Sequence, residues 1–141
     1  MFVLDTNIVS ELRKTRSNRA DPNVVNWINR YEPAAFFISA ITVLELEQGT
    51  RMVERRDTAQ GMSLRMWLEE IVYPRFSNRI LEFDALSAKI CARFHIPDPK
   101  PERDAMIAAT AARHGYTLAT RNVNDFLGLG VGLINPWNAS P

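Results

Sequence analysis

Four polar residues lie in or beside predicted helices and strands and are the first candidates for chemistry: Asp5, Glu45, Asp104 and Asn122. Oxygen ligands without histidine or cysteine favour Mg²⁺ or Mn²⁺ over Zn²⁺. Such ions can polarise a phosphodiester and activate a water molecule, so the protein needs to supply only carboxylates. Taken singly, each acid could instead be a helix cap or a surface charge. A common function therefore requires a fold that brings the four residues together.

Short apolar runs alternate with helical patterns along the whole chain. We expect strands at 2–4, 35–38, 80–81, 116–119 and 133–134. We expect helices at 6–12, 22–31, 40–53, 57–71, 85–94 and 102–114. This alternation predicts an α/β fold with a parallel sheet and helices on both of its faces.

Capping residues and prolines set the predicted element boundaries. Asp21, Ser39 and Asp84 are placed to cap the helices that follow them, and Pro74 should stop the helix before it. The three prolines in 96–101 predict a stiff loop. In parallel sheets the functional crevice lies beyond the carboxyl ends of the strands, and Asp5 directly follows the first strand. The chemistry should therefore lie at this edge of the sheet.

Length and composition limit the class of protein. The chain has 141 residues, 46% of them hydrophobic, which suits one core and predicts a single domain over 1–141. Apolar stretches are broken well before the roughly 18 residues of a membrane span, and residue 1 leads directly into a strand. We therefore expect a soluble chain without a signal peptide. A lone cysteine, Cys91, fits a cytoplasmic location.

The charge is nearly balanced, with 17 basic and 16 acidic residues and a net charge of +1. It therefore predicts no general attraction to nucleic acid. Two local clusters could follow a phosphate backbone, although a solvated surface is the simpler explanation of each. They are Arg13, Lys14, Arg16 and Arg19, and Arg51, Arg55 and Arg56.

Other chemistries find little support in the sequence. There is no nucleotide-binding glycine loop and no nucleophilic serine elbow. His114 precedes Gly115 at a predicted helix end, and neither His95 nor His114 is given a catalytic role. Trp27 and Trp67 lie on apolar helical faces and should pack in the core or an interface. The role of Trp137 stays open.

Four segments resemble the signatures of PIN domains, and their order and separation match along the whole chain. They are Leu4-Asp5-Thr6-Asn7, Glu45-Leu46-Glu47-Gln48-Gly49, Asp104-Ala105-Met106-Ile107-Ala108-Ala109-Thr110-Ala111, and Ala119-Thr120-Arg121-Asn122-Val123-Asn124-Asp125-Phe126. In detail the chain resembles the VapC toxins, especially their FitB-like branch. These toxins are the ribonuclease halves of type II toxin–antitoxin pairs. The resemblance implies a three-layer α/β sandwich with a central parallel sheet flanked by helices.

The resemblance also implies roles for individual residues. The family's metal-binding acids match Asp5, Glu45 and Asp104, and its neighbouring hydroxyl positions match Thr6 and Thr120, with Asn7 as a further supporting residue. Glu47 would be only a neighbour, and Gly49 could serve simply to let two helices pack closely.

The fourth acid of the family falls at Asn122, a departure that Asp125 can partly compensate. An amide in place of a carboxylate removes one negative charge, so a second metal should bind more weakly. We expect one firm Mg²⁺ or Mn²⁺ site.

By the same resemblance, the chain should cleave RNA with a metal-activated water, form a homodimer and be inhibited by a cognate VapB-like antitoxin. The helices of 40–71 are the candidate antitoxin surface. Operator DNA should be bound only through the antitoxin complex. Two alternatives remain open, namely a non-toxin metal-dependent phosphoesterase or RNA-processing nuclease, and an inactive interaction module that keeps the fold.

Overall fold

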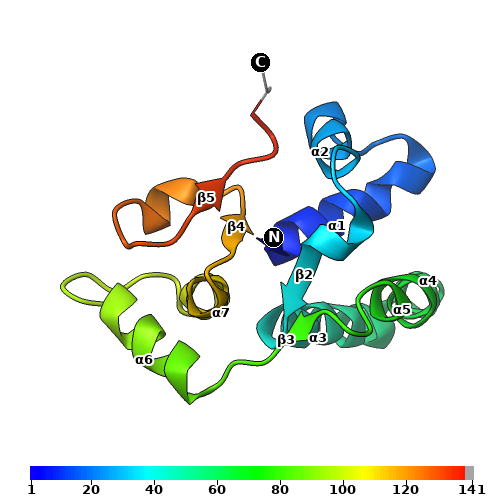
Figure 1. The fold of residues 1–141 in the computed structure, drawn as a ribbon. Coiled ribbons are helices and arrows are strands. Elements are labelled where there is room, and N and C mark those ends of the chain that lie inside the picture. The colour runs from blue at the N-terminus through cyan, green and yellow to red at the C-terminus, as the bar shows by residue number, and fades with distance from the viewer. Residues whose placement is uncertain (139–141) are drawn as a thin grey trace.

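The structure is a computed structural model that describes residues 1–138, and its centre is a parallel sheet of five strands (Figure 1). The order across the sheet is β3-β2-β1-β4-β5, and every neighbouring pair is parallel. The strands are β1 Phe2–Leu4, β2 Phe36–Ser39, β3 Ile80–Leu81, β4 Thr117–Ala119 and β5 Leu133–Ile134. The predicted α/β class and parallel sheet are therefore confirmed.

Helices connect the strands and cover both faces of the sheet (Figure 1). The α-helices are α1 Thr6–Arg13, α2 Pro22–Ile28, α3 Ala40–Arg56, α4 Thr58–Trp67, α5 Tyr73–Arg75, α6 Ala85–Phe94 and α7 Glu102–His114. A π-helical turn, η3 (Leu68–Val72), joins α4 to α5, and the short 3₁₀ turns are η1 Lys14–Ser17, η2 Pro33–Ala35 and η4 Val123–Phe126. Among residues 1–138, none of the helices combines the length and the apolar character that a membrane span requires.

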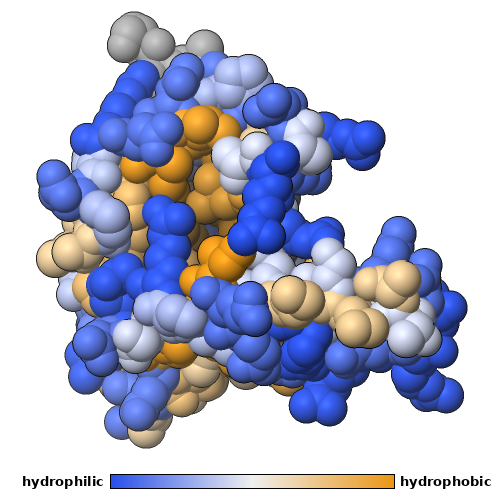
Figure 2. All heavy atoms as spheres, turned by 90° about the vertical axis from the view of Figure 1, so that its right-hand side faces the viewer, coloured by the Kyte–Doolittle hydropathy of each residue, from blue (hydrophilic) through white to orange (hydrophobic). Residues whose placement is uncertain are grey.

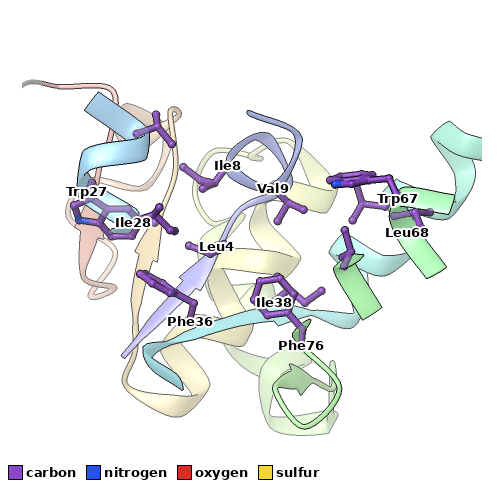
Figure 3. Close-up of a cluster of buried hydrophobic side chains, with 14 residues drawn as sticks. Leu4, Ile8, Val9, Trp27, Ile28, Phe36, Ile38, Trp67, Leu68 and Phe76 are labelled. Atoms are coloured by element: carbon purple, nitrogen blue, oxygen red, sulfur yellow. The ribbon is translucent and has the colours of Figure 1, made fainter. Parts of the chain in front are cut away.

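The sheet separates two hydrophobic clusters because successive side chains of a strand point to opposite faces. Leu4 of β1 belongs to one cluster, which it shares with side chains of α1, α2 and α4 (Figure 3). The preceding Val3 belongs to the other, which is built largely on α6 and α7. Trp27 and Trp67 are buried in the first cluster, as predicted. The arrangement is the three-layer sandwich expected from the resemblance.

Side-chain caps begin several helices where the sequence predicted them. Asp21 Oδ1 accepts a hydrogen bond from the N–H of Asn23 at 2.8 Å, and Ser39 Oγ accepts one from Thr42 at 3.1 Å. Asp84 Oδ1 accepts the N–H of Ser87 at 2.8 Å. Each cap satisfies a backbone donor that the first helical turn leaves free.

Three predicted helix ends are wrong. The helix expected to end at 53 continues to Arg56. The helix expected to reach position 31 ends at Ile28. Pro74 does not stop the preceding helix, because it lies in the first turn of α5, after the π-helical turn η3. Proline is tolerated in the first turn of a helix, where its missing N–H costs no hydrogen bond, so the helical path continues through Pro74 to Arg75.

The close contact between α3 and α4 depends on Gly61. A Cβ atom at Gly61 would lie 2.6 Å from Glu54 Cα, too close for the helices to keep their spacing. A Cβ atom added at Gly49, in contrast, would have no atom within 4 Å. Helix packing therefore explains Gly61 and not Gly49, which contradicts the packing explanation that the sequence left open for Gly49.

Candidate metal-binding active site

Asp5 is the centre of the candidate site and lies at the carboxyl end of the central strand β1. Its side chain is buried, with only 5% of the residue exposed. Oδ1 accepts the N–H of Thr6 at 2.7 Å, so Asp5 also caps α1. Oδ2 accepts the hydroxyl of Thr120 at 2.7 Å and the amide of Asn7 at 3.4 Å. The strand, the helix cap and the end of the neighbouring β4 thus fix this carboxylate.

The surroundings make the charged form of Asp5 unfavourable. Burial, together with the negative charges of Asp104 and Glu45, raises the pKa of this carboxyl from 3.8 to about 6. The hydrogen bonds from Thr120 and Thr6 act in the opposite direction but do not compensate. A positive charge beside such a buried carboxyl group would stabilise its charged form.

Glu45 reaches the site from α3 through a chain of hydroxyl groups. Thr6 Oγ1 donates to Glu45 Oε1 at 2.7 Å and lies 3.0 Å from the hydroxyl of Thr42. Thr42 is fully buried, and Ser39 lies 3.4 Å from the same hydroxyl. The end of β2 and the first turns of α3 therefore orient Glu45 toward Thr6, the residue directly after Asp5.

Asp104 lies in the first turn of α7, where the helix dipole favours a negative charge. Partial burial nevertheless raises the pKa of its carboxyl, and the charge of Glu45 adds to the increase. Asn122 Nδ2 lies 3.4 Å from Asp104 Oδ2 and acts as the donor. Asn122 therefore donates a hydrogen bond to Asp104, whereas a fourth carboxylate at this position would add another negative charge.

A cavity of about 430 Å³ opens over these acids. Its lining includes all three predicted metal-binding acids, together with Thr6 and Asn7. The other residues around it are Ser10, Glu11, Lys14, Arg121 and Trp137. The parallel sheet explains why Asp5 and Arg121 line the same cavity, because they follow the neighbouring strands β1 and β4 at the same edge of the sheet.

The donor set fits a hard divalent cation, since it consists of carboxylate, hydroxyl and amide oxygens. Within residues 1–138, however, no three acidic, histidine or cysteine groups are close enough to ligate a single ion together. Mg²⁺ is commonly held by one or two carboxylates and keeps several water ligands. The site therefore fits an ion with a partly aqueous shell better than a closed protein cage.

Other residues singled out in the sequence have different positions. Glu47 accepts hydrogen bonds from Tyr73 at 2.5 Å and Arg65 at 2.9 Å, and so faces α4 and α5. It is the neighbour expected. Asp125 lies in η4 and does not line the acidic cavity, although its charge raises the pKa of the Asp104 carboxyl. It adds negative charge near the site but does not line the cavity.

Sequence reasoning missed Glu11, a buried carboxylate beside the acids. Glu11 accepts the N–H of Asp21 at 2.9 Å and pairs with Lys14 at 3.0 Å. Burial raises the pKa of this carboxyl, but the two hydrogen bonds and the positive charges of Lys14 and Arg121 outweigh burial and hold the pKa below its usual range. Its position on α1, one turn after the buried Ile8, was the available signal.

The profile of the PIN domain family matches residues 2–127, and the chain belongs to this family. The chain is 36% identical to the VapC ribonuclease Y4jK of Sinorhizobium fredii, with 97% of this chain and 98% of the relative covered. It is 34% identical to Toxin FitB of Neisseria gonorrhoeae, with 98% and 99% covered. Among solved structures, FitAB bound to an IR36 DNA fragment superimposes with a TM-score of 0.88 at 31% identity, covering 100% of this chain and 99% of that one.

Proposed function

We propose that this chain is the toxin of a type II toxin–antitoxin pair and a divalent-metal-dependent endoribonuclease. The observation that carries the proposal is the meeting of Asp5, Glu45 and Asp104 around one cavity. The raised pKa of the buried Asp5 carboxyl supports it, because a cation would offset the burial of this charge and its repulsion from Asp104 and Glu45. Full-length similarity to proteins named as a VapC ribonuclease and Toxin FitB supports the reaction class.

Asp5, Glu45 and Asp104 would hold Mg²⁺ or Mn²⁺ together with bound water, one or two of them as direct ligands and the rest through water, with Thr6, Asn7 and Thr120 as supporting groups. When bound, such an ion polarises a phosphodiester and lowers the pKa of a bound water. The protein's own part is to place the carboxylates before the substrate arrives.

Thr120 and Thr6 keep Asp5 in one orientation through hydrogen bonds of 2.7 Å. Thr6 does the same for Glu45 through its hydroxyl. Asn122 orients Asp104, and Asp125 adds negative charge nearby.

A second cavity, of about 710 Å³, offers a path for RNA because it shares Thr6 and Glu45 with the acidic cavity. The first basic cluster noted in the sequence lines it: Arg13, Lys14, Arg16 and Arg19. Phosphates of a single strand would meet positive charge there before they reach the acids. Gly49 also borders this cavity, where the lack of a side chain leaves its wall open.

An apolar cavity of about 220 Å³ between α1, α2 and α4–α5 is our candidate surface for an antitoxin segment. Leu12, Trp67 and Ile71 contribute to its wall, and three arginines border it: Arg13, Arg16 and Arg75. Figure 2 shows hydrophobic residues at the bottom of a hollow with hydrophilic residues around it. An antitoxin segment with apolar anchors and acidic flanks would fit. We further propose a homodimer, and contact with operator DNA only through the antitoxin.

The direct test incubates purified, antitoxin-free protein with total cellular RNA in Mg²⁺, Mn²⁺ or EDTA. Asp5→Asn and Asp104→Asn proteins, checked for folding by circular dichroism, serve as controls. The proposal predicts discrete fragments that require metal and both acids. Intact RNA in the presence of folded wild-type protein and metal would instead favour a phosphoesterase with another substrate or an inactive interaction module. Addition of the protein encoded by an adjacent antitoxin-like gene should suppress the fragments.

A further inference from the structure

Arg121 and Trp137 form a stacked pair at the wall of the acidic cavity. Arg121 follows β4, and its Cζ atom lies 4.2 Å from the centre of the Trp137 ring. Both residues line the cavity that contains Asp5, Glu45 and Asp104. A guanidinium over an indole ring is held by cation–π attraction and by stacking. A positive group is therefore placed beside the acids by an aromatic ring from the C-terminal segment.

The rest of the fold holds Trp137 in position. Asn23 Nδ2 of α2 donates to the Trp137 carbonyl at 2.8 Å, and the Trp137 N–H donates to Asn135 Oδ1 at 3.0 Å. The ring packs against the hydrophobic cluster that contains Leu4. Its indole nitrogen is buried and meets no acceptor among the described residues, so packing and not a hydrogen bond of the ring fixes it.

Two cations, Arg121 and Lys14, line this cavity, and they differ in whether they are already paired with an acid. Lys14 is paired with the buried Glu11 at 3.0 Å. Across residues 1–138, Arg121 takes part in no salt bridge, and its exposed guanidinium donates no hydrogen bond. Stacking occupies the face of a guanidinium and not its N–H donors. Arg121 therefore keeps donors for an anionic ligand.

We propose that Arg121, held on Trp137, binds a backbone phosphate of single-stranded RNA next to the bond that is cleaved. The proposal rests on the ribonuclease function proposed above. A phosphate suits the position because a guanidinium can donate two parallel hydrogen bonds to its oxygens. Inside the acidic cavity the carboxylates repel the RNA backbone, and Arg121 is the cation there that forms no salt bridge within residues 1–138. Trp137 is then a positioning residue, and Arg121 is the residue that contacts the substrate.

A base stacked on Trp137 is the competing role for this pair. The Arg121 guanidinium already covers one face of the ring, and the ring also packs against the Leu4 cluster. A base would therefore have to displace Arg121. The two roles differ in their dependence on charge, because stacking tolerates added salt and a phosphate contact does not.

The test measures binding of a fluorescein-labelled single-stranded RNA by anisotropy in EDTA, over a series of salt concentrations. All proteins carry Asp104→Asn to exclude cleavage. Arg121→Gln removes the charge and most of the donors, Arg121→Lys keeps the charge, and Trp137→Phe keeps a smaller ring. Arg93→Gln is the matched control, since Arg93 is an exposed arginine of α6 that does not line the acidic cavity.

The phosphate contact predicts that Arg121→Gln weakens binding and reduces the slope of log K against log salt by about 0.7, the value for one phosphate of a single strand. Arg121→Lys should keep the slope and Trp137→Phe should weaken binding modestly, with Arg93→Gln unchanged. In the background with Asp104 intact, Arg121→Gln should raise KM for RNA cleavage more than it lowers kcat.

An unchanged slope in Arg121→Gln, or an equal loss in Arg93→Gln, would overturn the inference. So would a lack of RNA binding by the protein with Arg121 intact. Failure of wild-type protein to cut RNA tests the proposed function separately, because the binding measurement needs no cleavage.

Discussion

The hydroxyl of Thr120 donates a hydrogen bond of 2.7 Å to Oδ2 of Asp5 and so joins the ends of two neighbouring parallel strands. Thr120 is fully buried, and the same hydroxyl accepts the backbone N–H of Asn122 at 3.0 Å. One side chain therefore connects the central acid of the site to the loop that carries Arg121 and Asn122. Substitution of Thr120 therefore tests how much this hydroxyl contributes to the stability of the site.

Thr120→Val should destabilise the metal-free protein by about 1–3 kcal/mol, because a buried carboxylate and a backbone N–H each lose a partner. Urea unfolding at pH 7.5 in EDTA measures the change. Thr120→Ser is the control, since it keeps the hydroxyl. Equal stability of the Val and Ser proteins would show that this hydrogen bond contributes nothing.

The pKa of Asp5 predicts a pH dependence of stability in the absence of metal. Its folded-state pKa of about 6 lies above the ordinary 3.8, so the folded chain binds more protons between these values. The free energy of unfolding contributed by this group is therefore highest below pH 4 and falls as pH rises through 6. At neutral pH the loss amounts to roughly 2–3 kcal/mol.

Asp5→Asn should remove this dependence and stabilise the metal-free protein at pH 7.5. The measurement compares urea unfolding of both proteins in EDTA from pH 4.5 to 8. The difference between the two curves isolates Asp5 from acids with lowered pKa values, such as Glu47 and Glu11. A difference that stays constant over this range would contradict the raised pKa.

Gly61→Ala and Gly49→Ala should change stability in opposite directions. A methyl group at Gly61 would meet the backbone of Glu54, so α3 and α4 must move apart, at a cost of about 1–3 kcal/mol. At Gly49 the methyl group meets nothing, and a more favourable helix propensity should add about 0.5–1 kcal/mol. Thermal unfolding of both variants measures these changes in stability. A stabilised Gly61→Ala protein would contradict the packing described for these helices.

Local chemical signals explain why most of the fold could be predicted from the sequence. Asp21, Ser39 and Asp84 cap helices as expected. The apolar runs gave the strands to within a residue or so, and their alternation with helices predicted a parallel sheet. That sheet then placed Asp5 and the segment after β4 at one edge.

Features that depend on tertiary contacts could not be predicted in this way. Nothing in the pattern near Pro74 indicates a π turn, because the turn depends on how η3 packs on the core. The pairing of Arg121 with Trp137 joins two segments that no periodicity relates. The resemblance identified Asn122 as a departure, but the contact between its amide and Asp104 is evident only in the structure.

Glu45 and Glu47 provide a matched pair for the assignment of the acids. Glu45→Gln removes a carboxylate from the cavity and should lower the rate of RNA cleavage by at least ~10-fold. Glu47→Gln changes a side chain that is held by Arg65 and Tyr73, so it should affect stability and leave the cleavage rate close to that of wild type. Rates on one labelled RNA at saturating Mn²⁺ provide the comparison. The reverse order of effects would exclude Glu45 from the site.

The most direct measurement is the cleavage rate of a defined RNA as a function of Mn²⁺ concentration, for wild type and Asp104→Asn. The proposed metal site predicts no cleavage in EDTA and a saturable increase with Mn²⁺ for the wild-type protein. Asp104→Asn should need much more Mn²⁺ or remain inactive, because the ion loses a carboxylate. A wild-type rate that is unchanged in EDTA, or an Asp104→Asn protein with the wild-type Mn²⁺ dependence, would contradict the metal site.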